Sequence, residues 1–371
     1  MSNVKLRVLV VEAYADLRGG AESWLLRLLD ATDELDVQAV LLKEGGLGEA
    51  LERRGIPVET HVVGRNAWSF FEPVIWLARR LHSDPPDVVL ANITKAQLVA
   101  APAGRIAKVP TVWAKHDHGY DRLLAVLLGR MSDKVIGAVE ELAAPTRRRD
   151  AVIIPPPLPD REPASREEAR AALRDRGITL GEQPALVMAG RLVPFKGVDD
   201  AVLALGRPGA QGWALFVAGE DDHAAPGETD RLRAVAAEAG VADRVHFMGH
   251  VAGVSHWLAA FDALAVLTRP GERRAPNSEG FGTSAFEAML AGVPVIATGT
   301  GAVTRRLDGD RAGAAVPTGN PDAVARALGR FADPKERAAA GAVAREAVAD
   351  HPDAAECARR LVSVLRDAAA R

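Results

Sequence analysis

Short apolar runs alternate with amphipathic segments along this chain of 371 residues, and that alternation restricts its fold more than any other feature. Each run has the length of a buried strand, and the segment after it repeats apolar residues at the spacing of one helix face. Strands separated by helices pair in parallel, with helices covering both sides of the sheet. The first half, with predicted strands at 6–11, 37–42, 58–63, 88–91, 111–114, 135–138 and 152–154, is therefore expected to form a doubly wound α/β sheet.

A cluster of prolines interrupts the pattern at 155–157 and at Pro159. Because proline has a fixed φ and no amide hydrogen, a central strand cannot continue through this cluster. A second series follows, with predicted strands at 186–189, 215–218, 245–248, 264–267, 293–297 and 314–316. One hydrophobic core stops growing at about 250–300 residues, which also favours two domains. We predict Rossmann-like domains at 1–155 and 161–350, a linker at 156–160, and a C-terminal helix at 351–371 that packs back on the first domain.

Composition excludes several classes of protein. With 48% hydrophobic and 26% charged residues, the chain is expected to fold as a globular protein. A net charge of −3 gives no basic field of the kind that nucleic-acid binding requires. The single cysteine, Cys357, cannot form an internal disulfide. No nucleic-acid partner is expected, and the oligomeric state is open.

The distribution of apolar residues and the N-terminal sequence bear on where the protein is located. No apolar run approaches the roughly 20 residues that cross a bilayer. The N-terminus enters a strand without a secretory leader, so a cytoplasmic location is expected. The apolar run 123–128, with Arg130 and the basic residues 147–149, fits either a buried helix or a contact with anionic lipid. Peripheral contact with the inner membrane face is left open.

Parallel α/β sheets bind ligands beyond the carboxyl ends of their strands, so the loops at those ends are examined first. Loop 190–197 follows a predicted strand and carries Arg191 and Lys196 between glycines. Arg191 can bind phosphate oxygens through two parallel hydrogen bonds, and Lys196 adds a point charge. Together they would stabilise the negative charge of a departing diphosphate. Ordinary exposed cations would give the same local pattern.

A second loop carries two glutamates, Glu279 and Glu287, on either side of a glycine-rich turn into a helix. Amides at such a helix start can bind a phosphate, which the helix dipole also favours. Glu287 can accept hydrogen bonds from vicinal ribose hydroxyls and Glu279 from sugar hydroxyls. The alternative is a helix-start carboxylate followed by a surface glutamate. The intervening residues that we assign to the same site are Gly280, Phe281, Gly282, Thr283 and Ser284.

These two loops, with Gly-Gly-Ala-Glu at 19–22 and Arg-Val-His-Phe-Met-Gly at 244–249, occur in an order that resembles one family. The chain resembles the GT-B-fold retaining glycosyltransferases of the "glycosyl transferases group 1" family, glycosyltransferase family 4. The resemblance covers nearly the whole chain and is most specific in its C-terminal half. It implies two Rossmann-like domains that face each other across a cleft. It also implies transfer of a hexose from a nucleoside-diphosphate sugar to a hydroxyl of a glycan, glycolipid or small natural product.

The resemblance further implies residue roles. Arg191 and Lys196 would bind the donor diphosphate, Glu287 the ribose and Glu279 the transferred sugar, and the backbone at Val251 would lie near the base. It implies a retaining front-face mechanism in which the departing phosphate helps to deprotonate the acceptor. The nucleotide sugar is then a co-substrate, and neither a metal nor another cofactor is expected. Residues 308–310, Asp-Gly-Asp, have the Asp-x-Asp spacing of a metal site, but we interpret them as a polar turn.

On the acceptor side, Gly19 and Gly20 follow the first strand, where missing side chains let backbone approach a ligand; a plain tight turn is equally compatible. His116 follows the fifth predicted strand and resembles the family histidine that contacts the donor sugar. His118 is the alternative in a shifted register. We predict that His116 positions the sugar rather than acting as the general base, and we place it with Arg191, Lys196 and Glu279 in the catalytic set.

Several interpretations compete with this one. A sugar-nucleotide epimerase or a phosphorylase would share the scaffold, and a non-catalytic sugar-nucleotide-binding protein would share the site. A dinucleotide-dependent oxidoreductase is disfavoured, because no Gly-x-Gly-x-x-Gly follows the first strand. Two further segments have open roles: the charged insert 271–276, and an aromatic cluster of Trp68, Phe70, Phe71 and Trp76 that fits either acceptor binding or helix packing.

Overall fold

The structure is a computed structural model that describes residues 4–15, 19–63, 71–122, 124–159, 163–223, 225–251, 253–269, 279–299 and 301–370. The chain forms two compact units, which are described separately. Unit 1 contains Met1–Pro157 and Pro352–Arg371, and unit 2 contains Leu158–His351. The first division therefore falls within the proline cluster, and the chain returns to unit 1 at Pro352.

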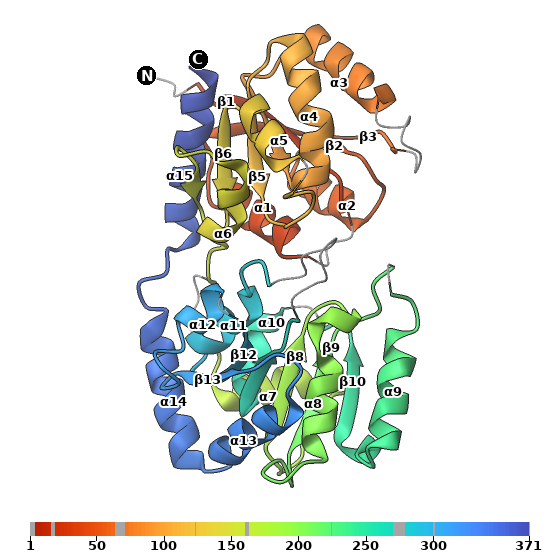
Figure 1. Ribbon diagram of the computed structural model, residues 1–371. Helices are drawn as coiled ribbons and strands as arrows, with labels where there is room; N and C mark the ends of the chain where they lie inside the picture. Colours follow the sequence, from red (N-terminus) through yellow and green to blue (C-terminus); the bar gives the residue numbers. More distant parts are fainter. Residues whose placement is uncertain are drawn as a thin grey trace. The chain divides into compact units, whose positions relative to one another are not determined.

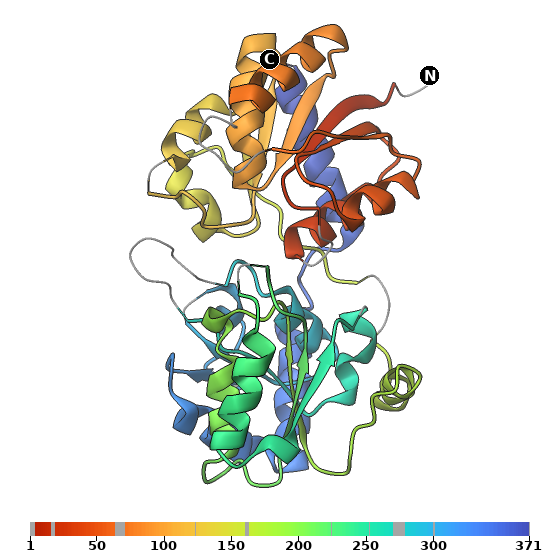
Figure 2. The ribbon, with the colours of Figure 1, turned by 90° about the vertical axis from the view of Figure 1, so that its right-hand side faces the viewer.

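Unit 1 is built on a parallel sheet whose described strands lie in the order β3-β2-β1-β4-β5-β6-β7 (Figures 1 and 2). Side chains alternate between the faces of a strand. Val8 and Val10 of β1 pack in a core with α1 and α15, whereas Leu9 and Val11 pack in another core with α3 and α4. The strands are β1 Leu6–Glu12, β2 Leu35–Leu41, β3 Val58–Thr60, β4 Val88–Asn92, β5 Thr111–Lys115, β6 Lys134–Gly137 and β7 Val152–Ile153.

The helices of unit 1 connect these strands and cover both faces of the sheet (Figures 1 and 2). The C-terminal helix α15 joins them from the far end of the sequence, and it packs against α1, β4 and β5. Its N-cap Asp353 accepts a hydrogen bond from the amide of Glu356, which fixes where the helix begins. The helices are α1 Gly20–Asp30, α2 Gly46–Glu52, α3 Phe71–Ser83, α4 Thr94–Ala107, α5 Ala125–Met131, α6 Glu140–Ala143, η2 Ala144–Thr146 and α15 Ala354–Ala369.

Unit 2 contains a second parallel sheet, in the order β10-β9-β8-β11-β12-β13 among the described strands. Its central strands are apolar throughout, as expected for strands that helices cover on both faces. The strands are β8 Ala185–Ala189, β9 Ala214–Ala218, β10 Val245–Gly249, β11 Ala263–Val266, β12 Val295–Thr298 and β13 Gly313–Val316.

Local capping signals set the ends of several unit 2 helices. Ser165 and Glu168 form a reciprocal capping box at the start of α7, and Asn320 caps α13 directly before Pro321. The helices are α7 Arg166–Arg174, η3 Pro194–Lys196, α8 Val198–Leu205, α9 Glu228–Glu238, η4 Ala242–Arg244, α10 Val254–Trp257, η5 Leu258–Ala260, α11 Thr283–Leu290, α12 Ala302–Arg305, α13 Pro321–Phe331 and α14 Pro334–Ala347.

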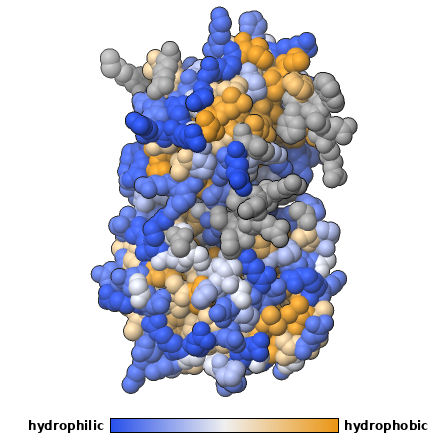
Figure 3. Space-filling view, viewed as in Figure 1, coloured by the Kyte–Doolittle hydropathy of each residue, from blue (hydrophilic) through white to orange (hydrophobic). Residues whose placement is uncertain are grey.

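The two sheets confirm the predicted fold class of two Rossmann-like doubly wound units with helices at the C-terminus. Every predicted strand overlaps an observed one, although the third is shorter than expected and ends at Thr60. Among the described residues, no helix combines the length and the apolar character that a bilayer crossing requires. Apolar surface gathers over α3 and α4 of unit 1 (Figure 3), where Phe71, Ile75 and Ile106 are exposed.

Candidate active site

In unit 2, β8 lies beside β11 in the sheet. The next strands, β9 and β10, follow on the far side of β8, and β12 and β13 follow on the far side of β11. Such a reversal opens a crevice beyond the carboxyl ends of the two strands, and ligands of open α/β sheets bind there. The loop after β8 carries Arg191 and Lys196, and the chain after β11 leads to Glu279 at the start of α11. The fold therefore brings the two predicted donor loops to one edge of the sheet.

Lys196 and Glu279 form an ion pair at this edge. Lys196 Nζ donates to Glu279 Oε2 at 2.7 Å, and Thr268 Oγ1 donates to the same oxygen at 2.7 Å. Burial of Glu279 disfavours its charged form, but the charge and hydrogen bond of Lys196, helped by Thr268 and Arg191, outweigh burial and lower its pKa. Both side chains of the pair keep 25% exposure, so a ligand can reach them.

Arg191 lies in the same loop and forms an ion pair of its own. Its Nη1 atom donates to Asp222 Oδ2 at 2.7 Å, while 48% of the side chain stays exposed. The next residue, Leu192, is held by the chain after β9, because its amide donates to Glu220 O at 2.9 Å and it bridges to Asp221. The loop is thus fixed by backbone bonds, and the Arg191 guanidinium stays accessible.

Two glycines make the path of this loop possible. A Cβ on Gly219 would lie 1.9 Å from Gly190 O, so the chains after β8 and β9 approach too closely for a side chain. Gly197 has φ 70°, and a Cβ there would lie 2.3 Å from Leu267 O. The Lys196 turn is therefore pressed against the end of β11, the strand that leads to Glu279.

Helix α11 begins at the glycine-rich turn predicted to bind phosphate. Gly282 is its N-cap, with φ 87°, and a Cβ there would lie 2.4 Å from Val303 Cγ2. The first amides to bond back to Gly282 O are those of Ala285 and Phe286. The amides of Thr283 and Ser284 precede these bonds and are at the helix end that favours an anion. Both residues are partly exposed.

The remaining predicted donor-side residues differ in how much of each is exposed to solvent. Glu287 lies on α11 and is only 5% exposed. Phe281 stacks on Phe286 with ring centroids 4.2 Å apart and also contacts His351, so its side chain is part of the core of unit 2. Val251 follows β10 and is 7% exposed. Gly280, next to Glu279, is partly exposed.

Unit 1 has an equivalent strand reversal, where β1 lies beside β4. The loop after β1 leads through Gly19 and Gly20 into α1, as the sequence indicates. A Cβ on Gly19 would lie 2.2 Å from Glu22 Oε2, so a larger residue at this position would have to displace the Glu22 carboxylate. Glu22 itself is 5% exposed.

Beneath that loop lies a buried carboxyl group that the sequence analysis missed. Glu12 ends β1 and is 1% exposed; its Oε1 accepts the amides of Ala13 and Tyr14 at 2.8 and 3.0 Å. Its Oε2 accepts Asn92 Nδ2 at 2.5 Å, and the same amide group donates to Ala21 O at 3.3 Å. Glu12 and Asn92 therefore hold both ends of the glycine loop. The available signal was a lone carboxylate ending an apolar run.

The protonation state of Glu12 follows from its burial. Burial, with a smaller contribution from the charge of Glu22, raises the pKa of Glu12 to about 8 against the opposing backbone and Asn92 hydrogen bonds. At neutral pH this carboxyl group is mostly protonated. It is a neutral structural group under the glycine loop rather than a charged ligand.

His116 follows β5 and is a neutral group for the same reason. Burial, opposed by the charge of Asp117 and helped by that of Lys115, lowers its pKa to about 4. Its ring packs edge-on against Trp24, with centroids 4.6 Å apart. Its Nε2 atom is buried and has no hydrogen-bond partner within the part of the chain that the structure describes. A neutral imidazole can donate or accept one hydrogen bond there.

The neighbours of His116 have partners elsewhere. Asp117 accepts the amide and hydroxyl of Thr94 at 3.0 and 2.8 Å, so its carboxylate caps α4 instead of orienting His116. His118 Nδ1 lies 3.0 Å from Asp121 Oδ2, and the buried Lys115 pairs with the other oxygen of Asp121 at 2.6 Å. The geometry therefore provides no histidine–carboxylate base at 116–117.

Some predictions lie outside the described residues: Trp68, Phe70 and the charged insert 271–276. The described part of the aromatic cluster includes Trp76, which stacks on His61 with ring centroids 4.1 Å apart. Within the described ranges, no group of three or more His, Cys, Asp or Glu side chains is arranged to hold a metal ion. Asp308 and Asp310 lie in a turn, where they accept hydrogen bonds from Arg311 Nη1 and the amide of Ala315.

Two parallel sheets with this helix cover and a helical C-terminus define the GT-B class of glycosyltransferase scaffold. The family model "Glycosyl transferases group 1" matches residues 183–333, and the model "Glycosyltransferase Family 4" matches residues 18–177. The chain belongs to this glycosyltransferase family, as its resemblance indicated.

Curated relatives include mannosyltransferases. The GDP-mannose-dependent alpha-(1-6)-phosphatidylinositol monomannoside mannosyltransferase of Mycobacterium tuberculosis is 38% identical over 191 residues, which are 50% of this chain and 46% of the relative. The lipopolysaccharide core biosynthesis mannosyltransferase LpsB of Rhizobium meliloti is 28% identical over 276 residues, 72% of this chain and 71% of the relative. The matched part of the chain thus spans about half the length of the first of these relatives (46%).

Solved structures share the fold over the whole chain. HepE of Anabaena, in complex with UDP and glucose, has a TM-score of 0.83 at 21% identity, covering 97% of this chain and 99% of that one. Sucrose-phosphate synthase from Thermosynechococcus elongatus has a TM-score of 0.75 at 18% identity, covering 98% and 99%. At these identities the likeness establishes the fold.

Proposed function

We propose that this protein transfers a hexose from a nucleoside-diphosphate sugar to a hydroxyl group of an acceptor. The observation that carries the proposal is the Lys196–Glu279 pair at 2.7 Å, at the carboxyl ends of β8 and β11 and next to the start of α11. A sugar diphosphate is bound by a cation and helix N-terminal amides, which bind its phosphates, and by a carboxylate that accepts hydrogen bonds from its sugar hydroxyls.

Each donor group then has one role. Lys196 and Arg191 bind the diphosphate and stabilise the charge that grows on it as the sugar departs. The amides at Thr283 and Ser284 contribute further donors. Glu287 accepts hydrogen bonds from the ribose hydroxyls, and Glu279 from hydroxyls of the transferred sugar. The lowered pKa of Glu279 keeps it an acceptor across the neutral range. Unit 2 is the donor-binding domain in this proposal, with the backbone around Val251 and Gly280 to Gly282 completing it.

The proposed reaction retains the anomeric configuration and needs no metal. The bond between the anomeric carbon and the β-phosphate oxygen breaks, and a bond to the acceptor oxygen forms on the same face. The acceptor hydroxyl proton passes to the departing phosphate oxygen, so no protein base is required. Asp117 supports this route, because it is engaged at Thr94 rather than at His116.

Unit 1 is proposed to bind the acceptor and to supply His116. Its neutral imidazole would contact a donor-sugar hydroxyl through the buried Nε2 atom. Gly19 and Gly20 would let the backbone approach the diphosphate. The acceptor is proposed to be a glycan, a glycolipid or a small natural product, and GDP-mannose is the first donor to test because the mycobacterial relative is named for it.

A thermal-shift panel tests the donor part directly. The full-length protein is heated with UDP, GDP, ADP and TDP and with their hexose conjugates, because a ligand that binds only the folded state raises the midpoint. At 100 times the dissociation constant, binding adds about 2.7 kcal/mol to the free energy of unfolding. We expect one nucleotide to raise the midpoint, and its sugar conjugate to raise it as well. No shift with any of them would overturn the proposal.

A further inference from the structure

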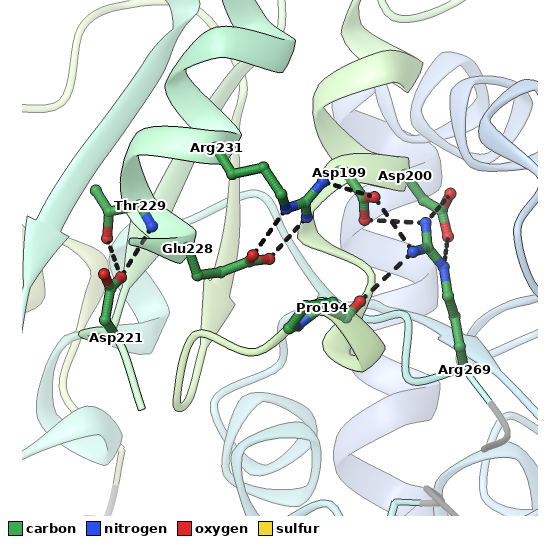
Figure 4. Close-up of polar contacts among 8 residues, drawn as sticks. All are labelled: Pro194, Asp199, Asp200, Asp221, Glu228, Thr229, Arg231 and Arg269. Atoms are coloured by element: carbon green, nitrogen blue, oxygen red, sulfur yellow. Dashed lines mark hydrogen bonds and ion pairs between the residues drawn. The ribbon is translucent and has the colours of Figure 1, made fainter. Parts of the chain in front are cut away.

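One arginine of unit 2, Arg269, lies beside Pro194 of the first donor loop (Figure 4). It follows Thr268, whose hydroxyl donates to Glu279 at 2.7 Å. Its own amide donates to Phe195 O at 2.7 Å, and its Nη1 atom donates to Pro194 O at 3.4 Å. One residue therefore holds two successive carbonyl groups of the turn that ends in Lys196.

Two aspartates in the first turn of α8 hold the guanidinium of Arg269 in place. Asp200 accepts hydrogen bonds from Arg269 Nε at 3.1 Å and from Nη2 at 2.6 Å, so the two residues form a bidentate ion pair. Asp200 is 4% exposed. Asp199 accepts Nη1 at 3.2 Å and lies 2.9 Å from Nη2. Acidic residues are favoured at a helix start, so this anchor is stable apart from any ligand. Only a guanidinium supplies enough planar donors for this set of acceptors.

Figure 4 shows that the same network continues away from the Lys196 turn. Arg231 of α9 donates to both oxygens of Glu228 at 2.7 Å and reaches Asp199 at 3.4 Å. Within the described part of the chain, its ion pairs go to these two residues only. Arg231 thus shares the chemistry of the network without holding the donor loop, although its side chain is 41% exposed against 29% for Arg269, and it provides a matched control.

We propose that Arg269 is a positioning residue that fixes the Pro194–Lys196 turn, and with it the Lys196–Glu279 pair, in the geometry that the donor diphosphate requires. This inference rests on the proposed function. Without the Arg269 side chain, the buried Asp200 loses its guanidinium partner and Asp199 keeps only Arg231 at 3.4 Å. Pro194 O also loses the hydrogen bond from Nη1, while the backbone bond to Phe195 O stays. A displacement of about 1 Å at a catalytic group lowers turnover by about 100-fold. The loss is therefore expected in kcat more than in KM.

The test compares Arg269→Lys, Arg269→Gln and Arg231→Gln in the full chain. Donor turnover is measured as nucleoside diphosphate released from the most active hexose conjugate of GDP or UDP, with kcat and KM separated. We expect kcat to fall about 100-fold in Arg269→Gln and less in Arg269→Lys. Lysine keeps the positive charge but cannot donate the two parallel hydrogen bonds of the guanidinium. Arg231→Gln should stay within about twofold of the wild type. Thermal unfolding of each variant establishes that it is folded.

The outcomes separate the two claims. Wild-type kinetics in a folded Arg269→Lys and a folded Arg269→Gln overturn the positioning role, as does an equal loss in Arg231→Gln. If Arg269→Gln does not fold, a kcat loss in a folded Arg269→Lys supports the role, and wild-type kcat in it refutes the role. A wild-type protein that neither binds nor turns over any donor refutes the proposed function instead.

Discussion

Replacing Glu12 by glutamine should remove a pH dependence from the stability of unit 1. The carboxyl group lies at the end of β1, 1% exposed, and its pKa is raised from 4.5 to about 8. Between these two values the folded state binds a proton that the unfolded state has released. The free energy of unfolding therefore falls as pH rises through this range, and the full contribution is present only below pH 4.5.

The titration of His116 sets the lower limit of the pH range in which Glu12, and not His116, changes the free energy of unfolding. Its pKa is lowered from 6.5 to about 4, so its contribution is complete above pH 6.5 and is lost as pH falls toward 4. From pH 6.5 to 8, Glu12 should lower the free energy of unfolding of unit 1 by about 2 kcal/mol, since each pH unit corresponds to about 1.4 kcal/mol. Glutamine stays neutral and can accept the same Ala13 and Tyr14 amides, so Glu12→Gln should be flat there.

Hydrogen exchange of the β1 amides measures this quantity in unit 1 separately from unit 2. Protection of the peptide covering Leu6–Glu12 is converted to an opening free energy at pH 6.5, 7.2 and 8, after correction for intrinsic exchange. The wild type should lose about 2 kcal/mol and Glu12→Gln should lose little. Equal slopes in the two proteins would refute the assignment of a buried, protonated Glu12.

Two further predictions concern α11 and the strand-end histidines. Gly282→Ala should lower the stability of unit 2 by about 1–3 kcal/mol more than Gly299→Ala. Both glycines have positive φ (87° and 85°), but among the described residues a Cβ on Gly282 meets Val303 Cγ2 at 2.4 Å and a Cβ on Gly299 meets no atom within 4 Å. Urea unfolding checks this, and equal losses would contradict the packing argument. His116→Ala should reduce donor turnover by at least about 10-fold, whereas His118→Ala, whose ring is paired with Asp121, should retain most of it. The reverse order in steady-state assays would place the functional histidine at 118.

The two sheets were predictable from the sequence because their central strands, such as β4, β9 and β11, are buried on both faces and read as apolar runs. Arg191, Lys196 and Glu279 could also be recognised from the sequence as candidate donor-binding residues, since each follows a strand in a glycine-rich loop. That Lys196 and Glu279 bond to each other was not predictable, because they are 83 positions apart and their contact depends on β8 lying beside β11.

The supporting groups were harder to anticipate. Glu12 and Asn92 look like ordinary polar strand ends, and only the pairing of β1 with β4 places them together. Asp117 is the neighbour of His116 in the sequence, but its hydrogen bonds go to Thr94. Arg269 carries no local pattern at all, since its partners belong to the η3 turn and the start of α8. Such roles depend on contacts between distant segments.

Donor turnover in the wild type and in Lys196→Met decides whether this protein transfers a sugar through the proposed donor site. Hexose conjugates of UDP, GDP, ADP and TDP are incubated with the full chain and simple hydroxyl acceptors, and released nucleotide and product anomer are followed by NMR. We predict one nucleotide per glycoside formed, retention of the donor's anomeric configuration, and a loss of about 100-fold or more in a folded Lys196→Met, as the proposed function requires. Absence of turnover with every donor, or an unchanged rate in Lys196→Met, would contradict it.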